Sequence, residues 1–248
     1  MKAITKFIDL NKSLAAITHQ ALNVLLPVSA FLLVSLDLFP LALALVLLSK
    51  WRVLAVKSRY WGINLRSNMV DVLLGISVVI FMDTTTLWPR LAWLGFYVVW
   101  VTLIKRLSGS YGMLTQAATA QALAVAAIFY QRQDTEIWFL TLGAWLIGYF
   151  CARHVISSLE EEHPAAVAHV WALFAAQVAW VSAHWQVWFW FIPQMAILLS
   201  VIFVSLALLH LLQKQEALTP ILFRQISGSL GILLVAILIF SDWQDKTI

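Results

Sequence analysis

The chain has few charged residues and a single cysteine, and both shortages exclude whole classes of protein. Charged residues make up 11% of the 248 positions and hydrophobic residues 62%, whereas an ordinary soluble domain is about 25% charged. A soluble fold cannot hide that much apolar surface. The one cysteine, Cys151, excludes an intramolecular disulfide and a cysteine-based metal cage. We interpret it as a small buried packing residue.

Recognisable catalytic and cofactor motifs are also missing from the sequence. It contains no P-loop, no GxSxG nucleophile elbow, no HExxH pattern and no dinucleotide fingerprint. All eight lysines lie in connectors, termini or the ends of apolar segments, so no lysine is placed to form a Schiff base within a helix. We therefore assign no catalytic residue, no metal ligand and no cofactor.

Long apolar runs separated by short connectors dominate the sequence. Because a backbone in lipid must satisfy its hydrogen bonds internally, we predict an all-α polytopic transmembrane bundle, and we treat residues 1–248 as a single transmembrane domain. A spanning helix needs ~20 apolar residues. About nine spans fit this requirement: residues 14–36, 38–56, 68–82, 87–104, 112–130, 136–156, 164–183, 187–212 and 218–240.

The distribution of basic residues predicts the orientation of the bundle. If the first two spans form a hairpin that turns between Asp37 and Pro40, thirteen of the sixteen lysines and arginines lie on one side of the membrane. One long helix kinked at Pro40 would weaken the division to ten against six. Positive connectors stay in the cytoplasm, so we expect the hairpin, with the amino terminus inside and the carboxyl terminus outside. The same connectors account for the net charge of +4 without nucleic acid as a partner.

The connector at residues 50–68, KWRVLAVKSRYWGINLRSN, is a basic juxtamembrane segment expected on the cytoplasmic side. If it is helical, Arg52, Arg59 and Arg66 recur every seven residues and form one stripe. Guanidinium groups suit anionic lipid headgroups or an acidic partner. We predict lipid or partner binding at these three arginines. The alternative is that they only set topology, with their side chains extended to the membrane surface.

Together with the three residues that follow, this connector reads KWRVLAVKSRYWGINLRSNMVD. In this stretch the chain resembles uncharacterised multi-pass membrane proteins of small-genome bacteria. The resemblance is confined to the stretch and its neighbours, and it implies no activity and no functional residue. It implies the bacterial plasma membrane as the location.

Small and polar residues within the apolar runs predict how the helices pack. Small residues four apart permit close helix approach in lipid, and polar side chains are costly when they face lipid. The small residues at helical spacing are Ala144 and Gly148, Ala168, Ala172, Ala175 and Ala179, and Ser227 and Gly231. The polar residues expected to form hydrogen bonds between helices are Thr115, Gln116, Thr119 and Gln121.

Three functions remain open, and each makes a different geometric demand. The leading interpretation is a non-catalytic subunit or lipid-contacting scaffold of a membrane assembly, with membrane lipids and other membrane-protein subunits as its partners. A carrier or channel for a small solute or lipid requires four amides to converge on one polar cavity: Gln116, Gln121, Gln177 and Gln194. An intramembrane enzyme acting on a lipid requires a second group to meet at an open cleft: His154, Glu160, Glu161, Glu162, His163 and His169.

Overall fold

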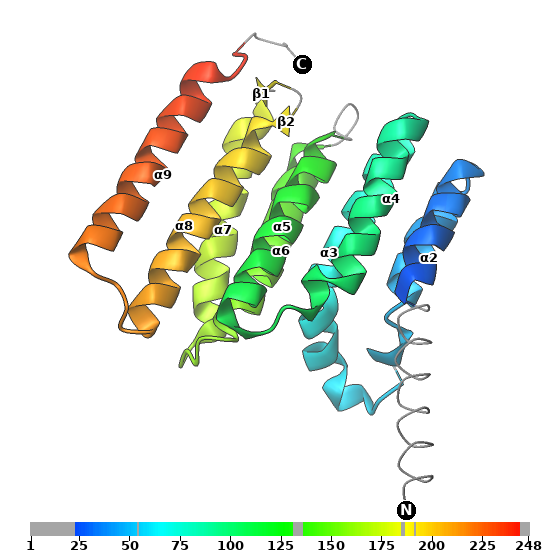
Figure 1. The fold of residues 1–248 in the computed structure, drawn as a ribbon, viewed down its shortest axis with the longest axis horizontal. Helices are drawn as coiled ribbons and strands as arrows, with labels where there is room; N and C mark the ends of the chain where they lie inside the picture. The colour runs from blue at the N-terminus through cyan, green and yellow to red at the C-terminus, as the bar shows by residue number, and fades with distance from the viewer. Residues whose placement is uncertain (1–22, 54, 131–135, 185–186, 191, 244–248) are drawn as a thin grey trace, which may run out of the picture. The chain divides into compact units, whose positions relative to one another are not determined.

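The computed structural model describes residues 23–53, 55–130, 136–184, 187–190 and 192–243, and these residues are predominantly helical (Figure 1). Seven of the described helices are long and apolar enough to cross a membrane, if the 3-10 turns η2 (Ser58–Tyr60) and η3 (Ile104–Arg106) are counted with α3 and α4. The predicted helical class is therefore confirmed, and the length and composition of the seven helices are compatible with a multi-pass membrane protein. The seven helices are α3 (Trp61–Thr84), α4 (Leu87–Thr102), α5 (Gly109–Tyr130), α6 (Ile137–Ile156), α7 (Pro164–His184), α8 (Gln194–Lys214) and α9 (Pro220–Phe240).

The chain breaks near Asp37, as the sequence predicts. Asn23–Ser35 and α2 (Phe39–Leu48) are separate apolar helices. At the end of the first, the Leu38 N–H donates to the carbonyl of Leu33 at 2.9 Å, and Asp37 itself has a φ of 57°. This arrangement is a Schellman cap, in which a left-handed residue ends the helix. One continuous kinked helix is therefore excluded, while residues 14–22 of the first predicted span lie outside the described residues.

The second predicted span, residues 38–56, is wrong in length. α2 ends at Leu48 after ten residues, which at 1.5 Å per residue gives about 15 Å, half the thickness of the hydrocarbon layer. Ser49 turns its hydroxyl back onto the carbonyl of Val46, and the chain continues through the 3-10 turn η1 (Trp51–Val53). Among the described residues seven helices are long enough to span, while the number of spans in the chain and the orientation of the termini stay predictions.

The chain divides into two compact units. The first combines Met1–Ala55 with Val78–Arg106, and the second combines Val56–Ser77 with Leu107–Ile248. α3 contributes its beginning to the second unit and its end to the first. No sequence signal marks the boundary between Ser77 and Val78, because there a continuous helix rather than a polar linker carries the chain from one unit to the other.

In the first unit, Arg90 closes the turn between α3 and α4. Its Nε donates to the carbonyl of Met82 at 2.7 Å and its Nη2 to the carbonyl of Thr85 at 3.2 Å. Carbonyls at a helix C-terminus have no partner within the helix, so the guanidinium supplies the missing donors. The rings of Phe81 and Trp93 stack beside this turn, with their centroids 4.7 Å apart.

In the second unit, α6 packs along α7, and α5 packs against both α6 and α8 (Figure 1). A Cβ placed on Gly148 of α6 would lie 3.1 Å from the Cβ of Ala175 on α7, so the two backbones approach closely. The close packing predicted for these spans is therefore confirmed. Five alanines of this interface are almost completely buried: Ala144, Ala168, Ala172, Ala175 and Ala179.

α9 packs against α8 and is otherwise exposed. Ile237 is its one buried residue. The close approach predicted at Ser227 and Gly231 is wrong within the described chain, because a Cβ added to Gly231 would meet no atom within 4 Å. Thr219 caps the helix by accepting from the Leu222 N–H at 3.2 Å. α9 is thus a regular apolar helix whose surface is free to face lipid.

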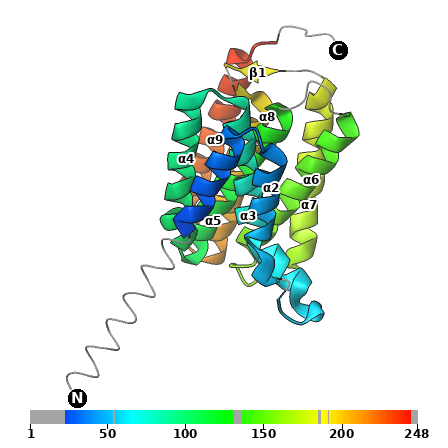
Figure 2. The same ribbon diagram turned by 90° about the vertical axis from the view of Figure 1, so that its right-hand side faces the viewer.

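The eighth predicted span, residues 187–212, begins too early. Trp188–Phe189 (β1) and Ile192–Pro193 (β2) form a short antiparallel pair, and α8 begins only at Gln194. Proline has no N–H to donate within a helix, which favours a helix start after Pro193. The Asp242 N–H donates to the carbonyl of Trp188 at 2.8 Å and joins β1 to the end of α9 (Figure 2). This pair is a small exception to the all-α prediction.

Candidate functional site

The three arginines of the predicted stripe do not share a helix. Arg52 lies in η1 and Arg59 in η2, with non-helical residues between them, while Arg66 lies in the second turn of α3. The seven-residue spacing therefore produces no helical stripe, and that expectation is wrong. The guanidinium of Arg59 instead lies over the ring of Tyr60, 4.6 Å from its centroid. Binding of lipids or partners by the individual arginines stays a prediction.

The four glutamines proposed for a polar cavity are not brought together. Gln116, Gln121 and Gln194 are buried, whereas Gln177 is exposed on α7. Each buried amide has its own partners, and Gln194 donates from Nε2 to the hydroxyl of Ser241 at 3.0 Å, which links α8 to the end of α9. The convergence that a carrier or channel requires is therefore not found among these residues.

Gln116 links α5 to α6. Its Nε2 donates to the carbonyl of Leu107 at 3.0 Å, and its Oε1 lies 3.0 Å from Nε2 of His154. Because an amide oxygen can only accept, this contact requires the proton of His154 on Nε2. The imidazole therefore takes part in helix packing, within the second unit, rather than pointing toward the other histidines of its cluster.

Gln121 joins three helices at a position that is 1% exposed. Its Nε2 donates to the carbonyl of Leu199 on α8 at 3.1 Å, and its Oε1 accepts from Nε1 of Trp171 on α7 at 3.1 Å. The predicted hydrogen bonding between helices is therefore confirmed for both buried glutamines of α5. It is wrong for Thr115 and Thr119, whose hydroxyls donate to carbonyls of their own helix.

The imidazoles and carboxylates between residues 154 and 169 also face different neighbours. His154 contacts α5, whereas the ring of His169 lies 4.5 Å from that of Tyr149 and 5.5 Å from that of Trp145, centroid to centroid. Glu161 contacts α8. Within the described ranges no group of three or more His, Cys, Asp or Glu side chains could hold a metal ion. The remaining members of the cluster are exposed: Glu160, Glu162 and His163.

Glu161 forms a charged cluster with α8 that the sequence analysis missed. Its Oε1 lies 3.1 Å from Nζ of Lys214 and 2.7 Å from Nε2 of His210, the second contact being at ion-pair distance but outside hydrogen-bond geometry. The hydrogen bond from Lys214 and the charges of both partners lower the pKa of Glu161. A signal was present, because a histidine and a lysine four residues apart share one helix face.

We expect acid to release the connector between α6 and α7 from α8. The folded-state pKa of Glu161 lies below its ordinary value of 4.5, so the contact stabilises the protein above that value and is lost as the pH falls through the lower folded value. Hydrogen exchange of residues 157–163, corrected for intrinsic rates, should accelerate as the pH falls from 4.5 through the lowered folded-state pKa of Glu161. Glu161→Gln should show the faster exchange already at neutral pH, and the exposed Glu162→Gln should not. Identical exchange in wild type and Glu161→Gln would contradict this expectation.

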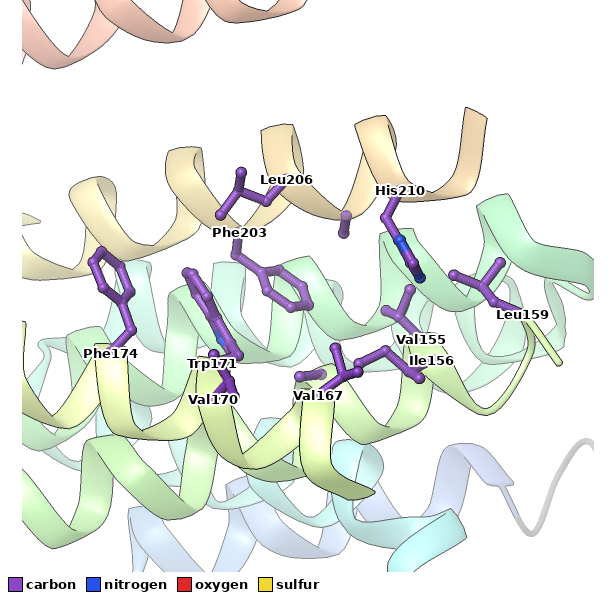
Figure 3. Close-up of a pocket in the computed structure, with 12 residues that line it drawn as sticks. Val155, Ile156, Leu159, Val167, Val170, Trp171, Phe174, Phe203, Leu206 and His210 are labelled. Carbon is purple, nitrogen blue, oxygen red and sulfur yellow. The ribbon is translucent and has the colours of Figure 1, made fainter. Parts of the chain in front are cut away.

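An apolar cavity of about 420 Å³ lies between α6, α7 and α8 (Figure 3). Aliphatic and aromatic side chains line it, and His210 is the one ionisable residue among them. The rings of Trp171 and Phe203 approach each other across α7 and α8, with their centroids 5.3 Å apart. The indole N–H of Trp171 is already bonded to Gln121. The cavity wall is therefore almost entirely carbon.

The cavity has a polar end and an apolar end. In Figure 3, His210 and Leu159 lie at one end and Phe174 at the other. Seven residues separate Phe203 from His210 on α8, which corresponds to a rise of about 10 Å. This length is shorter than one leaflet of the hydrocarbon layer, which is about 15 Å deep. Lys214 lies one turn beyond His210, so the polar end continues into the charged cluster with Glu161.

The fold and the cavity together define a class: a helical multi-pass protein with an apolar cavity between three of its helices. Compared with models of known protein families, with curated proteins and with solved structures, the chain matches none of them. Its function therefore has to be argued from its own residues.

Proposed function

We propose that this chain is a non-catalytic, lipid-contacting protein of a bacterial plasma membrane, which holds one acyl chain of a membrane lipid in the cavity between α6, α7 and α8. The observation that carries the proposal is the cavity itself, with carbon walls along its length and one polar end. Its volume of about 420 Å³ lies within the usual range of ligand sites. The bacterial location rests on the resemblance of the stretch at residues 50–71.

An acyl chain fits these walls better than a polar solute. A polar solute would leave its hydrogen-bonding groups unpaired, because the lining offers His210 as its one ionisable side chain. A lipid also supplies the right polarity at each end. Its chain would extend toward Phe174, and its headgroup would lie near His210 and Lys214.

The free energy of lipid binding has to come from close packing rather than from the hydrophobic effect. Lipid tails are as apolar as the cavity, so moving a chain from the bilayer into the protein gains little hydrophobic free energy. Close packing against fixed aromatic rings gains dispersion energy instead. Trp171 is suited to this role because Gln121 fixes its indole through the Nε1 hydrogen bond.

Filling the cavity should displace the lipid. Ala207 lines the cavity from α8, and Ala207→Phe would place a ring in the space that the chain occupies. In nanodiscs that contain phosphatidylcholine with a photoreactive acyl chain, we expect wild-type cross-links on α7 and α8, within residues 167–174 and 203–210. In Ala207→Phe these cross-links should fall about ten-fold, equivalent to ~1.4 kcal/mol of binding free energy.

The matched control is Val204→Phe, which adds a ring at an exposed position of α8 outside the cavity. It should cross-link like the wild type. Equal labelling in Ala207→Phe, Val204→Phe and wild type would sink the proposal, as would wild-type cross-links spread evenly over all exposed helix faces.

A further inference from the structure

The connector between α6 and α7, residues 157–163, borders the polar end of the cavity. Leu159 lines the cavity there and is 7% exposed (Figure 3). Glu161, two residues later, contacts α8 through its carboxylate. Between them Glu160 has a φ of 52°, in the left-handed region that residues other than glycine seldom adopt. This one segment therefore supplies both a part of the cavity wall and the acid that contacts α8.

Glu161 places a negative charge against two nitrogen groups at this end of the cavity. Its Oε1 lies 3.1 Å from Nζ of Lys214 and 2.7 Å from Nε2 of His210. Among the described residues it is the one carboxylate at ion-pair distance from either side chain. The Glu161 side chain is 16% exposed, against 41% for Lys214 and 33% for His210. The chain thus supplies its own anion at the polar end of the cavity.

The contact with His210 leaves a polar atom unsatisfied. Nε2 of His210 is buried and makes no hydrogen bond within the part of the chain that the structure describes, although Oε1 of Glu161 lies at ion-pair distance. A buried nitrogen without a hydrogen bond is costly, and native proteins seldom leave one in that state. His210 is also the one ionisable residue that lines the cavity. A ligand oxygen in better geometry would therefore improve on the carboxylate.

We infer that the cavity binds a lipid with an anionic headgroup, and that Glu161 stands in the place which this headgroup takes when the lipid enters. The inference rests on the acyl-chain site proposed above and names its class of lipid. Binding exchanges one anion for another. The headgroup phosphate accepts from Nζ of Lys214 and Nε2 of His210, and Glu161 moves into water with the connector. A phosphate has enough oxygens for both nitrogens, and hydrogen bonds between charged partners are the strong ones.

The surroundings of Glu161 permit this exchange. Its neighbours Glu160, Glu162 and His163 are exposed, so moving this part of the connector uncovers little apolar surface. A displaced carboxylate regains water as its hydrogen-bonding partner. The two exposed glutamates repel an anionic headgroup only weakly, because water and salt screen their charges.

Charge also distinguishes this class of lipid from zwitterionic ones. A choline headgroup carries a positive charge beside its phosphate, and Lys214 repels that charge. Phosphatidylglycerol has the phosphate without the cation, so it gains the attraction of Lys214 without the repulsion. The carbon-walled cavity favours a lipid over a free phosphate ion, because only a lipid supplies a chain to fill it.

Photoreactive phosphatidylglycerol and phosphatidylcholine with identical acyl chains test the inference in nanodiscs that contain the full chain. The measured quantity is the ratio of phosphatidylglycerol to phosphatidylcholine cross-links within residues 167–174 and 203–210. We expect Glu161→Gln to raise this ratio about ten-fold over the wild type, because the headgroup no longer competes with a carboxylate for Lys214. Adding Lys214→Gln to this variant should cancel the gain. The matched control is Glu162→Gln, which removes an exposed acid of the same connector and should keep the wild-type ratio.

A connector that is merely looser gives a different result. It would admit both lipids more readily and leave their ratio as it is, so an unchanged ratio in Glu161→Gln overturns the inference. A gain that survives Lys214→Gln overturns it as well. So does displacement of the phosphatidylglycerol probe by millimolar inorganic phosphate, since the ligand would then be a soluble anion. Absence of cross-links at these residues with both probes would instead contradict the acyl-chain site itself, and the inference with it.

Discussion

Replacing Gly148 by leucine should separate α6 from α7 and lower the free energy of unfolding by about 3 kcal/mol. A Cβ at this position would already lie 3.1 Å from the Cβ of Ala175 and 3.4 Å from the Cα of Ala172. The second of these atoms belongs to the backbone, so it cannot rotate away as a flexible side chain could. The remaining carbons of leucine fit only if the helices move apart, which would also open the row of buried alanines.

The measurement is an unfolding titration with sodium dodecyl sulfate in mixed micelles, followed by circular dichroism. The control is Gly231→Leu in α9, where an added Cβ meets nothing within 4 Å. Leucine favours a helix over glycine by roughly 0.8 kcal/mol, so this control should be neutral or stabilising. Comparable losses of unfolding free energy in both variants would show that Gly148→Leu acts by replacing a glycine in the helix backbone. The close approach of α6 and α7 would then not be the cause.

Gln121→Leu should lower stability by about 2 kcal/mol, because it removes two hydrogen bonds that join three helices. The amide donates to Leu199 and accepts from Trp171, with both distances 3.1 Å. Leucine has a similar size but no polar atoms, so the loss reports on hydrogen bonding more than on volume. Nε1 of Trp171 would be left as an unpaired donor in an apolar environment.

A double-mutant cycle distinguishes the hydrogen bond from general damage to the core. Trp171→Phe removes the donor that Gln121→Leu leaves unpaired, so the double variant should lose less than the sum of the two single losses, by about 1 kcal/mol. Gln177→Leu is the control, since Gln177 is exposed on α7. A fully additive cycle, or an equal loss in Gln177→Leu, would contradict the role given to Gln121.

Gln121→Leu also connects the stability of the fold with the proposed lipid site. Trp171 forms part of the cavity wall, and Gln121 determines how its ring is held. We therefore expect Gln121→Leu to weaken cross-linking of the acyl chain as well as folding. Ala207→Phe should weaken only the cross-linking, because its new ring enters an existing space.

The individual helices were predictable where local chemistry decides them. Prolines and caps begin α7 and α9 near their predicted positions, because proline is tolerated in the first turn of a helix. The break at Asp37 was predictable for a similar reason. The short α2 and the strand pair before α8 were not predictable, because a run of apolar residues has no feature that distinguishes a helix from a turn or a short strand.

The candidate sites were less predictable than the helices. Arg52, Arg59 and Arg66 have the spacing of a helical stripe, but the helix that would align them is absent. Gln116 and His154 do contact each other. That contact joins residues 38 positions apart, and no periodicity within one segment reports a contact of that kind.

The sequence alone determined that this chain is a helical multi-pass protein, because its composition leaves too few polar residues for any soluble surface. It also indicated close helix approach at the small residues of α6 and α7, although not which helices would meet there, and the same spacing at Ser227 and Gly231 of α9 produced no close approach. Only the tertiary structure decided which polar groups meet and where space remains. The contacts of Gln121 and the cavity beside Trp171 depend on how separate helices are placed. Such placement follows from packing over the whole bundle, which local patterns do not encode.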